Sequence, residues 1–156
     1  MNVAIIDYDA GNVQSLKFAL DKLGVDSILT KDRELISKSD KVIFPGQGAA
    51  KNAMNKLHIN DLVDLIPKLK QPVLGICLGM QMLLDRSAEF GEHEGLGIIA
   101  GDVVPIDSGH SPLNGRRLKI PNVGWRGLCV SDSNDRCQQS CLKQVEPHES
   151  VYFVHS

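Results

Sequence analysis

The chain has 156 residues, of which 42% are hydrophobic and 23% charged, a composition that excludes disordered, collagen-like and coiled-coil proteins. Its 17 Lys and Arg against 19 Asp and Glu give a net charge of −2. Because there is no basic block, neither nucleic acid nor an anionic membrane surface is an expected partner. The length predicts one domain with a core of its own.

The N-terminus carries no basic region ahead of an apolar stretch, and the longest nearly apolar run, residues 72–84, is too short to cross a bilayer. The chain is therefore expected to be cytoplasmic, with its four cysteines as free thiols. Cys129, Cys137, Cys141 and His148 contain no C-x-x-C pair, so neither a metal site nor a cofactor is predicted.

Short apolar runs alternate with helical patterns through the first half of the chain. Strands are predicted at 3–6, 26–29, 41–44 and 73–76, and helices at 13–23, 32–38 and in the segment after Pro45-Gly46 that ends near Pro67. Asp32 is the expected cap of the second helix, and Gly24 is expected to end the first. This alternation is typical of a parallel sheet covered by helices.

The pattern changes in the second half of the chain. Residues 78–84 are good helix formers, whereas glycine and proline are frequent after residue 91. Short runs at 98–104, 116–120, 127–130 and 151–154 predict further strands, arranged antiparallel. The predicted fold class is therefore α/β, with a mostly parallel sheet flanked by helices and an antiparallel portion.

Cys77 stands between a predicted strand and a predicted helix, in the segment Gly75-Ile76-Cys77-Leu78-Gly79. Small residues two before and two after a nucleophile have the spacing of a nucleophile elbow, a tight turn that presents the side chain above the sheet edge. The N-terminus of the following helix would favour the thiolate, and the Leu78 N–H would face an oxyanion formed beside the sulfur. The alternative is a buried structural cysteine whose neighbouring glycines serve packing only.

Five motifs follow one another along the whole chain: residues 7–15 (DYDAGNVQS), 44–49 (FPGQGA), 75–81 (GICLGMQ), 124–125 (GW) and 152–156 (YFVHS). Together they resemble the motifs of class I, triad-type glutamine amidotransferases, a family with a flavodoxin-like fold. Within that family the chain is most similar to the glutaminase subunits of imidazole glycerol phosphate synthases, which serve histidine biosynthesis.

The resemblance implies a reaction in which a cysteine attacks the carboxamide of glutamine, forms a thioester with release of ammonia, and returns glutamate on hydrolysis. No cofactor is implied. By position, the residues that match the family's site are the nucleophile Cys77, the oxyanion-hole residues Leu78, Gly46 and Gln47, and the glutamine-binding residues Gln81 and Glu89. Taken without the resemblance, Gln81 and Glu89 are ordinary polar surface residues.

The resemblance also implies a partner, a (β/α)8-barrel cyclase subunit that receives the ammonia, with Asn12 and Trp125 near the partner surface or the ammonia tunnel. Asn12 is equally typical of a simple turn, and a single tryptophan is more often part of a core. The chain has Asn122-Val123 where the family usually has His-Met. The ammonia acceptor therefore stays open between the cyclase and a sugar-modifying enzyme of a surface-polysaccharide pathway.

The family takes its general base and the carboxylate that orients it from a His-Pro-Glu tripeptide beyond the last of these motifs, and the chain does not contain this tripeptide. Glu146-Pro147-His148-Glu149 has the same letters in another order, and His155 belongs to the strand motif itself. We expect residues 1–156 to be an amidotransferase domain that lacks its C-terminal segment, of about 30 residues or more. Such a chain is expected to hydrolyse glutamine poorly and to expose sheet edges that favour aggregation or dependence on a partner.

Two other functions are compatible with the same residues. A catalytically inactive module that binds a barrel partner is favoured by the missing general base. A cysteine-dependent esterase or peptidase would use the same elbow, but it gives no role to Gln81 and Glu89.

Overall fold

The computed structural model describes residues 1–9, 12–106, 108–110, 115–128, 145–146 and 148–155. These residues divide into two compact units, residues 1–104 and residues 105–156. The first unit contains the predicted parallel sheet, and the second contains an antiparallel pair of strands. The expected fold class is thereby confirmed.

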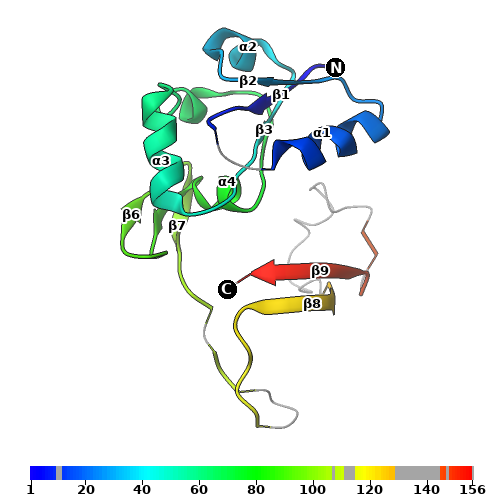
Figure 1. Ribbon diagram of the computed structural model, residues 1–156, viewed down its shortest axis with the longest axis vertical. Coiled ribbons are helices and arrows are strands. Elements are labelled where there is room, and N and C mark those ends of the chain that lie inside the picture. The colour runs from blue at the N-terminus through cyan, green and yellow to red at the C-terminus, as the bar shows by residue number, and fades with distance from the viewer. Residues whose placement is uncertain (10–11, 107, 111–114, 129–144, 147, 156) are drawn as a thin grey trace. The chain divides into compact units, whose positions relative to one another are not determined.

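A four-stranded parallel sheet, in the order β2-β1-β3-β4, forms the centre of the first unit (Figure 1). Its strands are β1 (Val3–Ile6), β2 (Ser27–Thr30), β3 (Lys41–Phe44) and β4 (Val73–Gly75). The bounds predicted for β1 and β3 are confirmed, whereas β2 begins one residue later than predicted and β4 ends one residue earlier. β1 and β3 are almost wholly buried, as expected of central strands whose two faces are both covered.

Helices cover both faces of this sheet (Figure 1). On one face, α1 (Val13–Lys22) packs its apolar stripe against the side chains of Val3, Ile5 and Ile43. On the other face lie α2 (Arg33–Lys38), α3 (Ala50–Ile59) and the 3-10 turn η1 (Ile66–Lys68), which enclose the larger core. Residues from these three elements, including Ile36, Leu57 and Ile66, are almost completely buried there.

The local signals that predict the start of α2 and the end of α1 are confirmed. Asp32 caps α2 by accepting hydrogen bonds from the backbone N–H groups of Glu34 and Leu35. Gly24 follows α1 with a positive φ of 66°, the conformation that glycine tolerates at the end of a helix. The helix predicted after Pro45-Gly46 is wrong in its end, because α3 stops at Ile59 rather than near Pro67, and Pro67 lies in the separate turn η1.

The helix predicted at 78–84 is longer than the helix in the structure. The structure has a single helical turn, α4 (Leu78–Gln81), followed by strand β5 (Leu84–Ser87). β5 pairs antiparallel with β6 (His93–Glu94) and parallel with β7 (Ile99–Val103), so strand pairing with distant residues overrides the local helix propensity. The strand predicted at 98–104 corresponds to β7, although β7 runs parallel to its neighbour rather than antiparallel.

The second unit contains an antiparallel pair, β8 (Asn122–Gly127) and β9 (Ser150–His155). β9 confirms the strand predicted at 151–154. The strand predicted at 127–130 is wrong in its position, since β8 ends at Gly127 and Leu128 is not part of a strand, while residues 129–130 lie outside the described residues. The strand predicted at 116–120 is wrong, since this segment contributes only an isolated bridge between His110 and Arg117. Among the described residues, no helix is long and apolar enough to cross a membrane.

We predict that Leu57→Ala lowers the free energy of unfolding by about 2–5 kcal/mol, because it leaves a cavity in the larger core. Leu57 has no exposed surface, whereas Ile59, two residues further along α3, is 80% exposed. Ile59→Ala is therefore the matched control, with an expected change below about 0.5 kcal/mol. Urea denaturation followed by circular dichroism measures both, and equal losses in the two variants would contradict the packing described for α3.

Candidate active site

Cys77 lies at the junction between β4 and α4, at the position predicted for a nucleophile elbow. It is a free thiol with an exposed side chain, so the alternative of a buried structural cysteine is wrong. Its backbone has φ 52° and ψ −118°, a conformation that is strained for any residue other than glycine. Strained residues of this kind persist where the surrounding structure holds them, and they cluster at functional sites.

The two glycines that flank Cys77 are required by packing. A Cβ atom on Gly75 would lie 2.6 Å from Met80 Cα, and one on Gly79 would lie 2.0 Å from the carbonyl oxygen of Phe44. Contacts this short exclude every residue except glycine unless the backbone moves. The turn therefore brings the backbone of α4 into direct contact with the end of β3.

The helix that follows Cys77 is shorter than the sequence predicts, so its N-terminus favours the thiolate less than expected. With four residues, α4 is one turn long, so no long-helix dipole acts on Cys77. Within this turn the Gly79 N–H already donates to the Ile76 carbonyl oxygen at 3.0 Å. The Leu78 N–H donates to no acceptor among the described residues, while the Leu78 side chain is buried. This N–H is therefore available to a ligand placed beside Cys77.

Residues 45–49, which we call the oxyanion loop, connect β3 to α3 and pack against the same turn. A Cβ atom on Gly46 would lie only 2.3 Å from Gly79 N, and the Ile76 N–H donates to the Phe44 carbonyl oxygen at 3.0 Å. Within the described part of the chain, the N–H groups of Gly46 and Gln47 donate to no protein acceptor. The structure thus brings the three predicted oxyanion-hole residues, Leu78, Gly46 and Gln47, into neighbouring positions.

Tyr8 also reaches this loop, although the sequence analysis did not single it out. Its side chain is completely buried, and its hydroxyl donates a hydrogen bond of 2.6 Å to the carbonyl oxygen of Pro45. Burial raises the pKa of the Tyr8 hydroxyl above its usual value, and the charge of Cys77 raises it further. The only sequence signal for this contact is an aromatic residue with a hydroxyl just after an apolar strand, in the first of the five motifs.

Gln81 lies next to Cys77 on α4, and Glu89 lies next to the first residue of α3. The Gln81 N–H donates to the Cys77 carbonyl oxygen at 3.1 Å, which places Gln81 one helical turn beyond Cys77. Glu89 Oε2 accepts a hydrogen bond of 3.2 Å from the N–H of Ala50, the first residue of α3. Because Ala50 directly follows the oxyanion loop, Glu89 is close to the end of that loop. Both side chains are half-buried.

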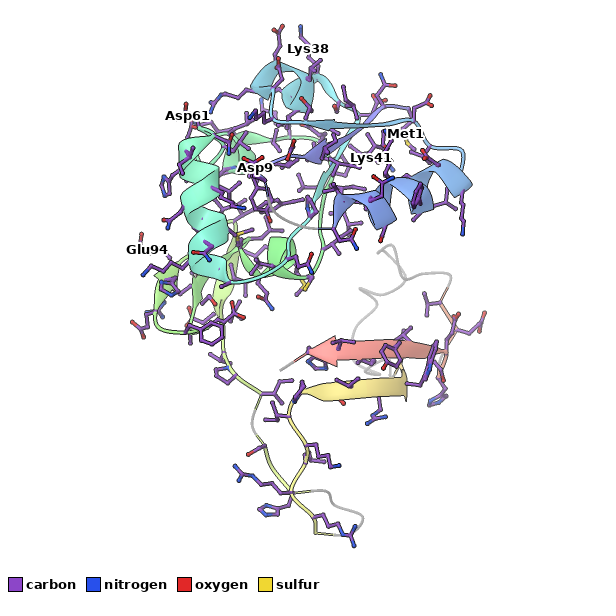
Figure 2. All side chains as sticks on the ribbon, in the orientation of Figure 1. Met1, Asp9, Lys38, Lys41, Asp61 and Glu94 are labelled. Carbon is purple, nitrogen blue, oxygen red and sulfur yellow. The ribbon has the colours of Figure 1, made fainter. Side chains whose placement is uncertain are left out.

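An open pocket of about 490 Å³ borders the oxyanion loop on the side of α3. Gln47 and Gly48 line it together with Asp9 and with Asn52 and Lys56 of α3. Asp9, labelled in Figure 2, has a positive φ of 60°, and Lys56 Nζ donates to its carbonyl oxygen. The turn after β1 is thus attached to α3 beside the loop.

The remaining predicted residues have other surroundings. Asn12 is exposed and caps α1, where its Oδ1 accepts from the Ser15 N–H at 3.4 Å, so it performs the turn role that the sequence also allowed. Trp125 belongs to the second unit, is 66% exposed, and contacts Tyr152 edge to face with ring centroids 5.5 Å apart. It is therefore not part of a core within the described residues.

The histidines near the C-terminus also belong to the second unit. His155 Nε2 lies 2.9 Å from Asn122 Nδ2, and His148 is exposed. Cys129, Cys137, Cys141 and Pro147 lie outside the described residues. In the part of the chain that the structure describes, no three His, Cys, Asp or Glu side chains are arranged to hold a metal ion.

Comparison with known proteins gives a consistent set of relatives. The profile of the family "Glutamine amidotransferase class-I" matches residues 4–156. The Imidazole glycerol phosphate synthase subunit HisH of Lacticaseibacillus casei is 43% identical over 99% of this chain and 70% of its own length. The subunit HisH 1 of Legionella pneumophila is 41% identical over 99% of this chain and 73% of its own length. The HisH subunit of Bacteroides thetaiotaomicron is 40% identical over 100% of this chain and 74% of its own length.

We predict that Gly79→Ala destabilises the chain by about 1–3 kcal/mol, because its Cβ would overlap the Phe44 carbonyl oxygen and force the oxyanion loop away from α4. Gly109→Ala is the matched control, since a Cβ there meets no atom within 4 Å. Thermal unfolding of the two variants measures the difference. A Gly79→Ala variant as stable as Gly109→Ala would show that loop and turn are not in backbone contact.

Proposed function

The chain belongs to the class I glutamine amidotransferase family, and from this premise we propose that it is the glutaminase subunit of an imidazole glycerol phosphate synthase, which supplies ammonia in histidine biosynthesis. The observation that carries the proposal is the identity of 40–43%, over nearly the whole chain, to relatives that bear that name. The strained, exposed Cys77 lies beside the Leu78 N–H, which has no acceptor among the described residues, and this supports the same chemistry. We further propose that residues 1–156 form part of one amidotransferase domain, because the family profile spans both units.

Cys77 is the proposed nucleophile. Its thiolate adds to the carboxamide carbon of glutamine, and the carbonyl oxygen becomes an oxyanion. The N–H of Leu78 and an N–H of Gly46 or Gln47 stabilise this oxyanion, since they are neighbouring donors without protein acceptors among the described residues. The proton that the Cys77 thiol lost on ionising reaches the amide nitrogen through solvent, the oxyanion collapses to a carbonyl as the C–N bond breaks, and ammonia leaves while the thioester remains. Water cleaves the thioester to glutamate and regenerates the thiol.

Glu89 and Gln81 are the proposed glutamine-binding residues. A carboxylate such as Glu89 pairs with the α-ammonium group of an amino acid, and the Gln81 amide both donates to and accepts from polar groups of the substrate. Because Glu89 also holds the first residue of α3, substrate binding at Glu89 acts next to the end of the oxyanion loop. The sequence contains no His-Pro-Glu tripeptide, so the decisive test of the site is covalent modification of Cys77 by a glutamine analogue rather than turnover.

The proposed partner is a barrel cyclase subunit that receives the ammonia, and the exposed Asn12 and Trp125 are the proposed contacts with it. We propose a cytoplasmic location because free glutamine, the substrate, is a cytoplasmic metabolite.

We predict that a chloroketone analogue of glutamine modifies Cys77 selectively, because the elbow exposes the thiol and Glu89 and Gln81 are the proposed groups that bind the amino-acid part. Mass spectrometry of the intact chain and of its peptides shows one adduct, on Cys77, and an excess of L-glutamine suppresses it while D-glutamine does not. Cys77→Ala abolishes the adduct, and the control variant Cys137→Ala retains it. Labelling spread over all four cysteines, without protection by glutamine, would contradict the glutaminase and favour the esterase or the inactive module.

We predict that the chain binds the cyclase subunit and that Trp125→Ala weakens this binding by about tenfold or more, as the loss of an exposed aromatic anchor does at many interfaces. Ile59→Ala, at another exposed apolar residue, leaves the affinity unchanged. Isothermal titration calorimetry measures both. Tighter binding to the acceptor subunit of a sugar-modifying amidotransferase would refute the assignment to histidine biosynthesis.

A further inference from the structure

We infer that Tyr8 is a positioning residue for the oxyanion hole: its hydroxyl holds the Pro45 carbonyl and thereby fixes the peptide that carries the Gly46 N–H. The inference rests on the proposed glutaminase and deepens it, since it assigns a role to a residue outside the set of substrate-binding and nucleophilic groups.

The contact joins the ends of two adjacent strands. Tyr8 lies two residues beyond β1, and Pro45 directly follows β3, which pairs with β1 along its length. The hydroxyl-to-carbonyl distance is 2.6 Å, and both residues are buried, so water does not compete for the carbonyl oxygen. A buried carbonyl without this donor would be left unsatisfied.

The geometry of the peptide bond transmits this contact to the oxyanion hole. The Pro45 carbonyl and the Gly46 N–H belong to the same planar trans peptide, in which the two groups point in opposite directions. Holding the oxygen therefore sets the direction of the Gly46 N–H. It also fixes the N-terminal end of the next peptide, which carries the Gln47 N–H.

The loop is held at its beginning and open at its tip. A Cβ on Gly79 would lie 2.8 Å from the Pro45 carbonyl oxygen, so both α4 and Tyr8 closely approach this oxygen. At Gly48, by contrast, φ is +93° and a Cβ would meet no atom within 4 Å. Rotation of loop peptides is therefore confined to the residues after Gly46.

Tyr8 acts as a donor under all ordinary conditions. Burial raises the pKa of its hydroxyl, and the charge of Cys77 raises it further, so the hydroxyl keeps its proton when the neighbouring thiol ionises. A carbonyl oxygen accepts only, which means that the bond needs this proton.

A role in packing alone is the competing explanation. The Tyr8 ring contacts Phe44 edge to face, with centroids 5.6 Å apart, and a phenylalanine would keep that contact and fill the same space. Only the hydroxyl separates the two explanations. Tyr8→Phe is therefore the informative variant, and Tyr152→Phe, at a tyrosine that is 54% exposed, is its matched control.

The experiment compares two reagents on Cys77 of the full chain. The glutamine chloroketone has a carbonyl that becomes an oxyanion when the thiolate adds to it, whereas iodoacetamide reacts by direct displacement without forming one. In Tyr8→Phe we expect the maximal rate of chloroketone inactivation to fall about tenfold, less than the loss of an oxyanion donor itself, with its half-saturating concentration and the iodoacetamide rate unchanged. Incorporation of p-aminophenylalanine at position 8, which keeps an N–H donor, restores the rate, and Tyr152→Phe behaves as the unmodified chain.

Hydrogen–deuterium exchange gives a second readout that does not depend on glutamine. We expect the amides of residues 46–49 to exchange faster in Tyr8→Phe, while those of β1 and α3 keep their rates. Unchanged exchange in the loop, or equal slowing of both reagents, overturns the inference. If the unmodified chain shows no preference for the glutamine analogue, the proposed function fails, and the exchange of residues 46–49 still decides whether Tyr8 holds the loop.

Discussion

Direct contact between two stretches of backbone organises the candidate site. The oxyanion loop after β3 and the turn after β4 approach so closely that neither Gly46 nor Gly79 has room for a Cβ atom. This contact is possible because β3 and β4 are adjacent parallel strands, whose C-terminal ends lie at the same edge of the sheet. The position of Cys77 relative to the proposed oxyanion donors therefore depends on the pairing of two strands about 30 residues apart in the sequence.

Around this contact, groups from distant parts of the chain hold the loop at both ends. At the beginning of the loop, Tyr8 donates to the Pro45 carbonyl oxygen. Where the loop ends, Glu89 accepts a hydrogen bond from Ala50, the first residue of α3. The middle of the loop, at Gln47 and Gly48, is exposed. The two ends of the loop are therefore fixed by contacts from the segments that follow β1 and β5, whereas its middle is not. The hydrogen bond between Tyr8 and Pro45 also joins the first motif, at residues 7–15, to the motif at residues 44–49, although the two are far apart in sequence.

The elements of the parallel sheet were predictable because their signals are local. Apolar strands, the Asp32 cap and Gly24 act within a few residues, and the structure has the corresponding elements within a residue of the predicted positions. The helix at 78–84 was predicted too long because Leu83 and Leu84 both favour helix locally. In the structure Leu83 packs in the larger core, and Leu84 begins β5, where it pairs with Ile99 of β7. The segment 116–120 has strand-like residues and yet forms only a single bridge, because no neighbouring strand pairs with it in the described residues.

The sequence by itself determined the fold class, the elbow around Cys77 and the family, because glycine spacing and apolar periodicity are properties of consecutive residues. Tertiary structure alone decided which groups meet at the elbow: the contact of Tyr8 with Pro45, the cap that Glu89 provides to α3, and the exposure of Cys77. The physical reason is that these contacts join residues 37 and 39 positions apart, through hydrogen bonds whose partners become neighbours only after the strands have paired.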